Sequence, residues 1–424
     1  MRKVRVGLAG LGTVGYGTYA VLNENAQVIS SRSGVGIEVA CAVVRNVAKA
    51  KEKTGGKLPI QTDFHAILDD PTIDIVVEVM GGVEPARTLI LDAIARGKHV
   101  VTANKHLIAT QGEEIFHAAQ ERGVTVAYEA AVAGGIPIIK ALREGLAADR
   151  IESVSGIVNG TSNFILTMMR EKGVSFSEAL RQAQELGYAE ADPTFDIEGI
   201  DAAHKMTILA GLAFGTPFNY EAAVTQGISS LQARDISIAD ALGYRIKLIG
   251  QAKRTTRGIE LGVHPRLVRK ESLFSQIDGV MNAVEVQADG LGPTFYSGRG
   301  AGERPTASAV VADIIDIART IDVEPCERVP MTGVLPEARS LIEYVSREET
   351  ESRFYVRVDV HDQTTARDVF EEFSIGVEFS RLYEDQTVFL LEKTSYGQFD
   401  AALEKIASES SVKASPVGLF VFDS

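Results

Sequence analysis

The chain has 424 residues, two cysteines and a formal net charge of −14 at pH 7. This length is too great for one hydrophobic core, so we expect two or three domains, and the uncompensated negative charge argues against nucleic acid as a partner. No stretch reaches the roughly 18 uninterrupted apolar residues of a membrane span, and Cys41 and Cys326 have no metal or redox spacing, so we expect a reduced, cytoplasmic protein.

Residues 3–128 alternate short apolar runs with segments of helix length. The candidate strands are Val4–Ala9, Ile37–Val44, Ile73–Glu78, His99–Thr102 and Val124–Tyr128, and the candidate helices lie near 14–29, 84–96 and 112–122. This alternation is typical of βαβ units around a parallel sheet. We therefore predict an α/β, Rossmann-type dinucleotide-binding domain over residues 1–130.

The segment Gly10-Leu-Gly-Thr-Val-Gly15 follows the first predicted strand and opens the first helix. Its glycines permit a tight turn, close approach of the backbone to a pyrophosphate, and near contact between helix and strand. The N–H groups at the helix start would face the phosphates. We predict that Gly10, Gly12, Thr13, Val14 and Gly15 bind a dinucleotide; the alternative is a glycine-rich structural turn.

The end of the second predicted strand bears on the choice of cofactor. A carboxylate there would accept a hydrogen bond from the ribose 2′-OH, whereas an arginine would meet a 2′-phosphate. The chain has Val44-Arg45-Asn46, with Lys49 and Lys51 just beyond and no acid. This pattern favours NADP over NAD. In the alternative, Arg45 is simply exposed and either cofactor binds.

From about 130 to 345, glycine- and proline-rich elements separate strands from helices. Strands at Ile151–Val158 and Ala283–Gln287, with helices near 138–147, 161–172, 176–187, 199–214 and 306–320, predict an α+β region. The helix that begins at Pro305-Thr306 is apolar nearly all round, so we expect it to be buried against the first domain. We assign residues 131–345 to substrate binding, catalysis and dimerisation.

Carboxylates are concentrated in the segment 187–205. Four of them lie in a predicted loop, namely Glu190, Asp192, Asp196 and Glu198, and Asp201 and Lys205 follow at the start of an apolar helix. Four residues are about 400° of helix rotation, so Asp201 and Lys205 share a face, within about 6 Å at Cβ. A carboxylate beside an ammonium suits a substrate that carries an amino group and needs a proton. The alternative is a solvated ion pair under an acidic turn.

A charged stretch at 346–352 precedes the last predicted domain, residues 350–424. Its candidate strands are Arg353–Val360, Val377–Tyr383, Thr387–Lys393 and 417–422, with helices at 364–374 and 397–408. The order β-α-β-β-α-β is that of a ferredoxin-like module.

Six long motifs follow one another along the chain. They are Gly10–Gly15, Val101–Lys105, Tyr128–Pro137, Gly156–Asn163, the 187–205 segment and Gly300–Ala309. In this order they resemble homoserine dehydrogenase over residues 1 to about 345, and the last module resembles the ACT-like module of monofunctional members. The resemblance implies reversible NAD(P)H-dependent reduction of L-aspartate 4-semialdehyde to L-homoserine, a step towards threonine and methionine.

The resemblance also implies roles for residues of the 187–205 segment. Lys205 would donate the proton to the aldehyde oxygen, Glu190 and Asp201 would bind the substrate, and Asp196 would belong to the same acidic pocket. This role suits Lys205 chemically, because hydride addition leaves an alkoxide that needs a cation or acid at about 3 Å. We interpret the neighbouring His204 as a structural histidine on another face of the helix.

Outside that segment the resemblance implies contacts with the cofactor. Lys105 would lie between nicotinamide and substrate, and Gly302 and Glu303 would contact the cofactor. For Lys105 the alternative is a solvated lysine at the end of a strand.

The resemblance further implies a monovalent cation site at Glu129 and the backbone carbonyls of Val132, Gly134 and Ile136. Carbonyl oxygens with a single carboxylate make a hard site of low charge, which suits Na⁺ or K⁺ better than a transition metal. In the alternative, Glu129 caps a turn and no ion binds.

The C-terminal module departs from the ACT pattern, because Asp362–Arg367 stands where a Pro-Gly turn usually receives an amino-acid effector. A role in assembly is the alternative, and we expect a homodimer or homotetramer.

Two rival functions remain open. One is a dehydrogenase for another amino-acid aldehyde or keto acid, and the other is a nucleotide-sensing regulator without catalysis.

Overall fold

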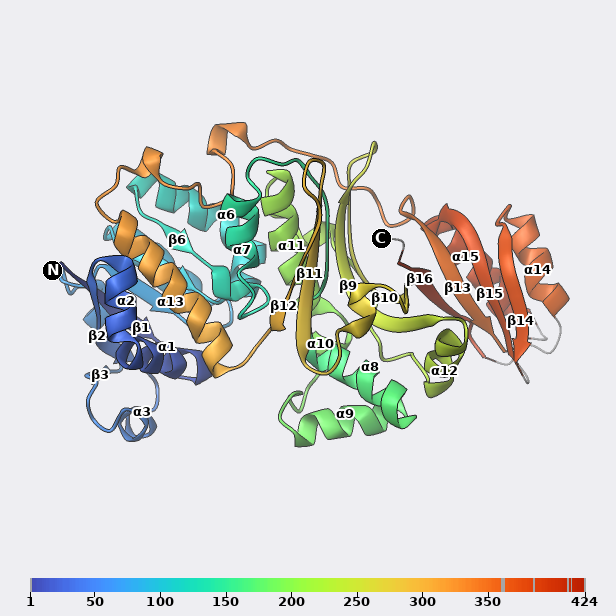
Figure 1. Ribbon diagram of the computed structural model, residues 1–424, viewed down its shortest axis with the longest axis horizontal. Helices are drawn as coiled ribbons and strands as arrows, with labels where there is room; N and C mark the ends of the chain where they lie inside the picture. The colour runs from blue at the N-terminus through green and yellow to red at the C-terminus, as the bar shows by residue number, and fades with distance from the viewer. Residues whose placement is uncertain (1, 360–362, 384–385, 410–411, 413, 423–424) are drawn as a thin grey trace. The chain divides into compact units, whose positions relative to one another are not determined.

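The computed structural model describes residues 2–359, 363–383, 386–409, 412 and 414–422. The chain forms two compact units, each assembled from separate segments (Figure 1). The first unit comprises Met1–Val154, Thr207–Tyr220 and Asn282–Leu341, and the second comprises Ser155–Met206, Glu221–Met281 and Ile342–Ser424. Division into three domains that are continuous in sequence stays a prediction.

A six-stranded parallel sheet forms the core of the first unit. Its strands are β1 (Lys3–Ala9), β2 (Gly36–Val43), β3 (Ile60–Gln61), β4 (Ile75–Glu78), β5 (His99–Thr102) and β6 (Val126–Ala127), in the order β3-β2-β1-β4-β5-β6. Every residue of β4 and β5 is buried, as expected of strands covered on both faces. The predicted Rossmann-type sheet is confirmed, although β3 was missed.

Two of the helices predicted beside the parallel sheet have different bounds in the structure, and the helices at Val47–Thr54 and His65–Leu68 were not predicted. The helices beside this sheet are α1 (Thr13–Glu24), α2 (Ala26–Ser33), α3 (Val47–Thr54), α4 (His65–Leu68), α5 (Ala86–Ala95) and α6 (Lys105–Arg122). The single helix predicted at 14–29 is two helices that meet at Asn25. The helix predicted at 112–122 begins seven residues earlier, because the Asn104 side chain accepts the Leu107 N–H at 3.2 Å and caps it.

Helix α13 (Glu303–Thr320) lies beside α1 in the first unit, although the two are far apart in sequence (Figure 1). A Cβ added to Gly17 of α1 would come within 2.7 Å of the Glu303 side chain, so glycine allows this close approach. Val310, Ile314 and Ile317 share one hydrophobic core with β1. The unit also holds α7 (Ile138–Lys140), which continues as a π-helical turn at Ala141–Gly145, β11 (Met281–Ala288) and β12 (Gly292–Arg299).

The second unit combines helices with a long antiparallel hairpin. Strand β7 (Ile151–Ile157) leads into α8 (Gly160–Lys172), α9 (Phe176–Glu185), α10 (Thr194–Ile197) and the start of α11 (Ile200–Phe214); α12 (Ala233–Ala241), β8 (Val224–Thr225), β9 (Tyr244–Arg254) and β10 (Ile259–Arg269) follow. Strands β9 and β10 pair over their whole length. The sequence did not predict this hairpin or α12.

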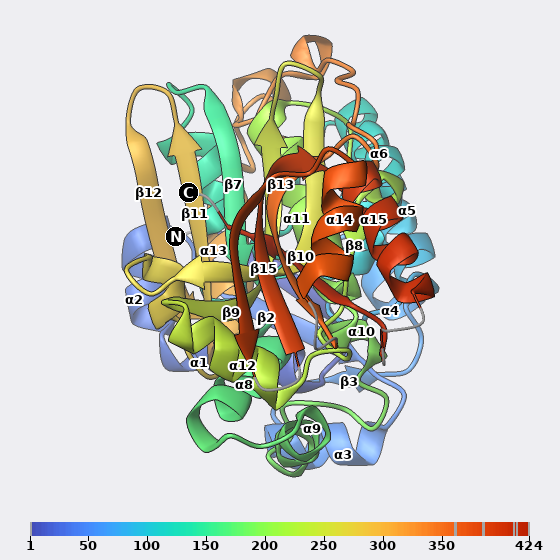
Figure 2. The same ribbon diagram turned by 90° about the vertical axis from the view of Figure 1, so that its right-hand side faces the viewer.

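The C-terminal part of the second unit has the predicted β-α-β-β-α-β order. It comprises β13 (Glu351–Val358), α14 (Gln363–Glu372), β14 (Val377–Tyr383), β15 (Gln386–Ser395), α15 (Tyr396–Ser408) and β16 (Val417–Val421). The sheet order is β16-β13-β15-β14, and side chains of α14 and α15 share its apolar core. The two helices lie side by side (Figure 2). Strand β16 also pairs with β10 in parallel. The expected effector turn, Asp362–Arg367, begins at residue 362, which lies outside the described residues, and its other residues form the start of α14.

In the described part of the chain, no helix combines the length and the apolar character needed to cross a membrane.

Candidate active site

The glycine-rich loop between β1 and α1 has the geometry of a dinucleotide-binding turn. Gly10 has φ +107°, which favours glycine, and a Cβ on Gly15 would lie 2.2 Å from the Gly10 carbonyl oxygen. A Cβ on Gly12, in contrast, would meet nothing within 4 Å. The first glycine therefore makes the turn, the third lets the helix approach, and the second leaves open space at the start of α1.

Lys105 is placed by a chain of hydrogen bonds at the carboxyl ends of β4 and β5. Glu78 is fully buried; one of its oxygens accepts the Thr102 hydroxyl at 2.7 Å and the other accepts the Met80 N–H at 2.7 Å. The Thr102 hydroxyl oxygen in turn accepts the Asn104 N–H at 3.0 Å. Asn104 caps α6, so Lys105 is the first residue of that helix at the edge of the sheet where ligands bind in such folds.

Other residues predicted at the cofactor also belong to the first unit. Arg45 is exposed just after β2, and Asn46 caps α3 by accepting the Lys49 N–H at 3.0 Å. Gly302 has φ +113° and precedes α13, whose first residue, Glu303, packs against Gly17 of α1. Of these residues, Glu303 therefore borders the helix that the glycine-rich loop opens.

Lys205 and Asp201 form a buried ion pair in the second unit. The Lys205 ammonium lies 2.6 Å from Asp201 Oδ2 and donates to the Val158 carbonyl oxygen at 2.7 Å. Their residues are 9% and 4% exposed. The shared helix face that we predicted is confirmed, and the alternative of a solvated pair is wrong because both groups are buried.

Asn159 joins this pair and was given no role from the sequence. Its side-chain Nδ2 donates to Asp196 Oδ1 at 2.7 Å and to Asp201 Oδ2 at 2.8 Å, and its Oδ1 accepts the Ser162 N–H at 2.8 Å as the cap of α8. The run Asn-Gly-Thr-Ser before an apolar helix carried the capping signal. It could not show which carboxylates the amide reaches.

The remaining residues of the acidic segment are dispersed. Glu190 is exposed, Asp192 accepts the Thr194 N–H at 3.1 Å, and Asp196 lies in the short helix α10 rather than in the predicted loop. His204 is buried and stacks on Phe195 with ring centroids 5.4 Å apart. The structure thus gathers Asp196, Asp201 and Lys205 around Asn159, with the Glu190 side chain at the surface.

Glu129 begins a 3-10 turn (Glu129–Ala131) in the first unit, and its buried carboxylate reaches the start of α7. Its two carboxylate oxygens accept the Ile139 and Lys140 N–H groups, each at 2.9 Å, and its own N–H donates to Asp313 at 2.8 Å. Burial, together with the nearby Asp313 charge, raises the pKa of Glu129 to about 8, and burial raises the pKa of Asp313 to about 7.

The backbone after Glu129 is tightly folded. Ala133 and Gly134 both have positive φ, and a Cβ on Gly134 would lie 2.4 Å from the Gly300 carbonyl oxygen. The N–H of Ile138 donates to the Ile136 carbonyl oxygen at 2.8 Å. No group of three or more His, Cys, Asp or Glu side chains could hold a metal ion among the described residues, so a cation here would depend on backbone carbonyls and one carboxylate.

The buried cluster is suited to proton transfer. An ammonium held by a carboxylate and a backbone carbonyl has a fixed direction, so it can deliver a proton to a bound oxygen without first being ordered. The carboxylates beside it suit a substrate ammonium group. In the first unit, the glycine-rich loop is suited to binding a dinucleotide.

Comparisons with known proteins agree with this chemistry. The sequence model of the family described as homoserine dehydrogenase matches residues 137–315, and that of its NAD-binding domain matches residues 10–129. The chain is 54% identical over 362 residues to a homoserine dehydrogenase of Pseudomonas aeruginosa, covering 85% of this chain and 83% of that protein. It is 52% identical over 363 residues to one of Neisseria gonorrhoeae, covering 86% and 83%.

Solved structures give the same result. A homoserine dehydrogenase from Thiobacillus denitrificans has a TM-score of 0.96 and 50% sequence identity, covering 100% of this chain and 99% of its own. A hyperthermophilic archaeal homoserine dehydrogenase in complex with NADPH has a TM-score of 0.64 and 29% identity, covering 76% and 98%. The chain therefore belongs to the homoserine dehydrogenase family of NAD(P)-dependent oxidoreductases.

Proposed function

We propose that this homoserine dehydrogenase catalyses the reversible reduction of L-aspartate 4-semialdehyde to L-homoserine, with Lys205 as the proton donor. The observation that carries the proposal is the buried cluster of Asn159, Asp201 and Lys205, in which the ammonium is held at 2.6 Å from a carboxylate. The nicotinamide cofactor supplies hydride to the aldehyde carbon, or takes it back from the alcohol.

In this proposal each side chain has a separate role in binding or reducing the substrate. Lys205 gives its proton to the oxygen that becomes the alcohol, and Asp201 keeps the ammonium of Lys205 aimed at that oxygen. Asp196 and Asp201 provide negative charge for the substrate ammonium, and Glu190 joins them from the acidic segment. For Lys105, the first residue of α6, we propose contact with the nicotinamide and the substrate, as the resemblance implies.

We further propose that the enzyme prefers NADP. Arg45 is exposed directly after β2 and could meet a 2′-phosphate, and no carboxylate occupies the positions that follow. Gly10, Gly12, Thr13, Val14 and Gly15 would hold the pyrophosphate, with Gly302 and Glu303 alongside. The archaeal relative in complex with NADPH is consistent with this choice, and NAD is the alternative cofactor.

A monovalent cation, Na⁺ or K⁺, is proposed to bind Glu129 and the carbonyls of Val132, Gly134 and Ile136. The raised pKa of Glu129 supports this, because burial and the Asp313 charge outweigh the nearby Lys140, and a bound cation would add positive charge there. The carboxylate already accepts two N–H groups, yet its two oxygens have further lone pairs for an ion.

Three broader expectations complete the proposal. The enzyme would work in the cytoplasm in threonine and methionine biosynthesis, as a homodimer or homotetramer. The C-terminal module would be ACT-like, either for assembly or as an effector site. Unchanged activity in saturating threonine, with no calorimetric signal, would discard a threonine effector.

The test of the proposed reaction is a purified-enzyme assay of NADPH oxidation. Aspartate semialdehyde should be reduced, and homoserine should drive the reverse reaction with NADP⁺. A homologous aldehyde or a 2-keto acid of similar length should react at least about 100-fold more slowly, since the buried polar groups would be left unpaired. No oxidation with aspartate semialdehyde would refute the proposal and favour a nucleotide-sensing regulator.

A further inference from the structure

One amide group holds two acids of the second unit, the buried Asp201 and the partly buried Asp196. Asn159 Nδ2 lies 2.7 Å from Asp196 Oδ1 and 2.8 Å from Asp201 Oδ2. A primary amide has two N–H donors, so each carboxylate can take one of them. The three side chains come from the turn before α8, from α10 and from α11, and Asn159 is therefore the point at which three elements meet.

The same carboxylate oxygen also receives the lysine. Asp201 Oδ2 accepts from Asn159 at 2.8 Å and from Lys205 at 2.6 Å, and the Val158 carbonyl next to Asn159 accepts from Lys205 at 2.7 Å. The turn at residues 158–159 thus orients Lys205 twice, once directly and once through Asp201. Asp201 and Lys205, the two residues that this turn contacts, are each more than nine-tenths buried, so water cannot easily replace either contact.

We infer that Asn159 is a positioning residue for the proton transfer, acting by fixing Asp201 and, through it, the direction of the Lys205 ammonium. This inference rests on the proposed role of Lys205. Without the Asn159 amide, Asp196 and Asp201 would lose the donor group that they share.

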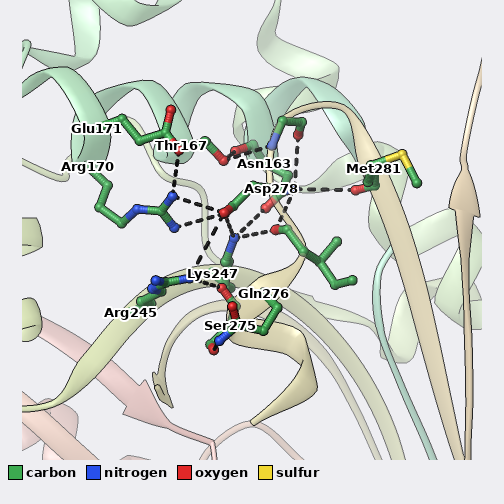
Figure 3. A network of polar contacts seen from close by, with 12 residues as sticks. Asn163, Thr167, Arg170, Glu171, Arg245, Lys247, Ser275, Gln276, Asp278 and Met281 are labelled. Carbon is green, nitrogen blue, oxygen red and sulfur yellow. Dashed lines mark hydrogen bonds and ion pairs between the residues drawn. The ribbon is translucent and has the colours of Figure 1, made fainter. Parts of the chain in front are cut away.

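Asn159 is itself held by the first turn of α8. Its Oδ1 caps the helix at Ser162, and one turn further Asn163 Nδ2 donates to the carbonyl oxygens of Ile277 and Gly279 at 3.0 and 2.9 Å. Lys247, 1% exposed, donates to Asn163 Oδ1 at 3.2 Å (Figure 3).

Asp278 completes the anchor of α8. Its carboxylate accepts from Lys247 at 2.9 Å and from both terminal nitrogens of Arg170 at 2.8 and 3.0 Å (Figure 3). Since Arg170 lies at the other end of α8, the helix is tied to the loop before β11 along much of its length. Because Asn159 caps α8, these contacts of α8 also fix the position of the Asn159 amide.

The substitution Asn159→Asp tests the hydrogen bonds that the Asn159 amide donates separately from its capping of α8. Aspartate has nearly the same shape and is as good a cap as asparagine, so the bond from Ser162 is kept. It cannot donate, and it places a third carboxylate beside Asp196 and Asp201. We expect a loss of kcat/KM of at least about 100-fold, as for removal of a general acid, with the thermal midpoint changed little.

A second substitution, Asn159→Ser, keeps a capping oxygen and removes the donor without adding charge. It carries the test if Asn159→Asp does not fold. We expect kcat to fall more than cofactor affinity, and the primary isotope effect on kcat with deuterated NADPH to rise, because proton and hydride transfer become rate-limiting. Ser175→Asp, at the exposed cap of α9, is the matched control and should behave as wild type.

A merely structural role would give a different pattern. Both Asn159 variants would then lower the thermal midpoint, while the folded fraction kept the wild-type kcat and isotope effect. Retention of kcat/KM within about threefold in both variants would overturn the inference. If Lys205→Met is inactive while the Asn159 variants are normal, only this inference fails; if Lys205→Met is fully active, the proposed proton donor fails as well.

Discussion

Arg357 of β13 and Asp235 of α12 form an ion pair inside the second unit, 2.5 Å from Nε to Oδ1, with side chains 2% and 0% exposed. Asp235 also accepts the Gln232 N–H at 2.9 Å, so it caps α12 as well. The pair joins the C-terminal module to a helix that precedes it by more than 100 residues. Removing one partner would leave the other charge buried and unpaired.

We therefore predict that Arg357→Met destabilises the protein by about 3–5 kcal/mol. Urea unfolding of the variant would measure this. Lys393→Met is the control, because Lys393 pairs with Glu351 on the surface and should contribute no more than about 1 kcal/mol. Equal losses for the two variants would show that burial of the Arg357 pair has no special effect.

His99 predicts a fall in stability at acid pH. Its Nδ1 accepts the Thr125 N–H at 3.0 Å, and burial, aided by the Arg328 charge, lowers its pKa from 6.5 to about 4. Because the unfolded chain binds the proton first, stability is complete above pH 6.5 and is lost as pH falls towards 4, by about 3 kcal/mol.

The substitution His99→Asn isolates this effect, since an amide oxygen can still accept the Thr125 N–H but does not titrate. Unfolding free energies of wild type and variant should diverge between pH 7 and pH 4.5, with the variant less sensitive to acid. The buried carboxylates of Glu129 and Asp313 change stability with pH in the opposite direction, but both proteins contain them, so their effect cancels in the comparison. Parallel pH profiles would contradict the assignment of the acid sensitivity to His99.

The pair of buried carboxylates, Glu129 and Asp313, predicts a cation effect that depends on pH. Their folded pKa values of about 8 and about 7 lie above the usual values, so their contribution to stability falls as pH rises from about 4 to 8. A bound monovalent cation would offset the buried charge. A hundredfold excess over Kd would stabilise by about 2.7 kcal/mol.

The measurement compares thermal midpoints in NaCl, KCl and choline chloride at equal ionic strength. We expect Na⁺ or K⁺ to raise the midpoint more at pH 8 than at pH 6, and Glu129→Gln to abolish the difference. Identical midpoints in all three salts would argue against the cation site.

Cofactor choice is predicted to depend on Arg45. Loss of a charged hydrogen bond to a 2′-phosphate costs about 1.5–3 kcal/mol, so Arg45→Ala should lower kcat/KM for NADPH about 10- to 100-fold. The same preparation assayed with NADH serves as its own control and should be unchanged. If both cofactors lose equally, or neither does, Arg45 does not select between them.

Local patterns in the sequence predicted those parts of the site whose residues lie close together in the chain. The glycine-rich loop and the Asp201–Lys205 pair depend on turns and on helical periodicity, which are readable from neighbouring residues. The contacts of Asn159 are 37 and 42 residues away in sequence, so only the fold brings them together. No local pattern could assign that amide to two acids.

The unpredicted hairpin has a physical explanation. Strand β9 contains the buried Lys247, and β10 contains the buried His264 and Arg266 with Pro265 between them. Buried charges interrupt the alternation of apolar and polar residues that identifies a strand, and proline argues against one. The groups that pair with such buried residues come from distant segments, as Asp278 does for Lys247.

The central claim is that Lys205 donates the proton, and steady-state turnover of Lys205→Met tests it most directly. We predict that NADPH binding, measured by fluorescence titration, stays within about threefold of wild type, while kcat falls by about 10²- to 10⁴-fold. Lys172→Met, at an exposed position of α8, should keep wild-type turnover. Wild-type kcat in Lys205→Met would contradict the proposed mechanism.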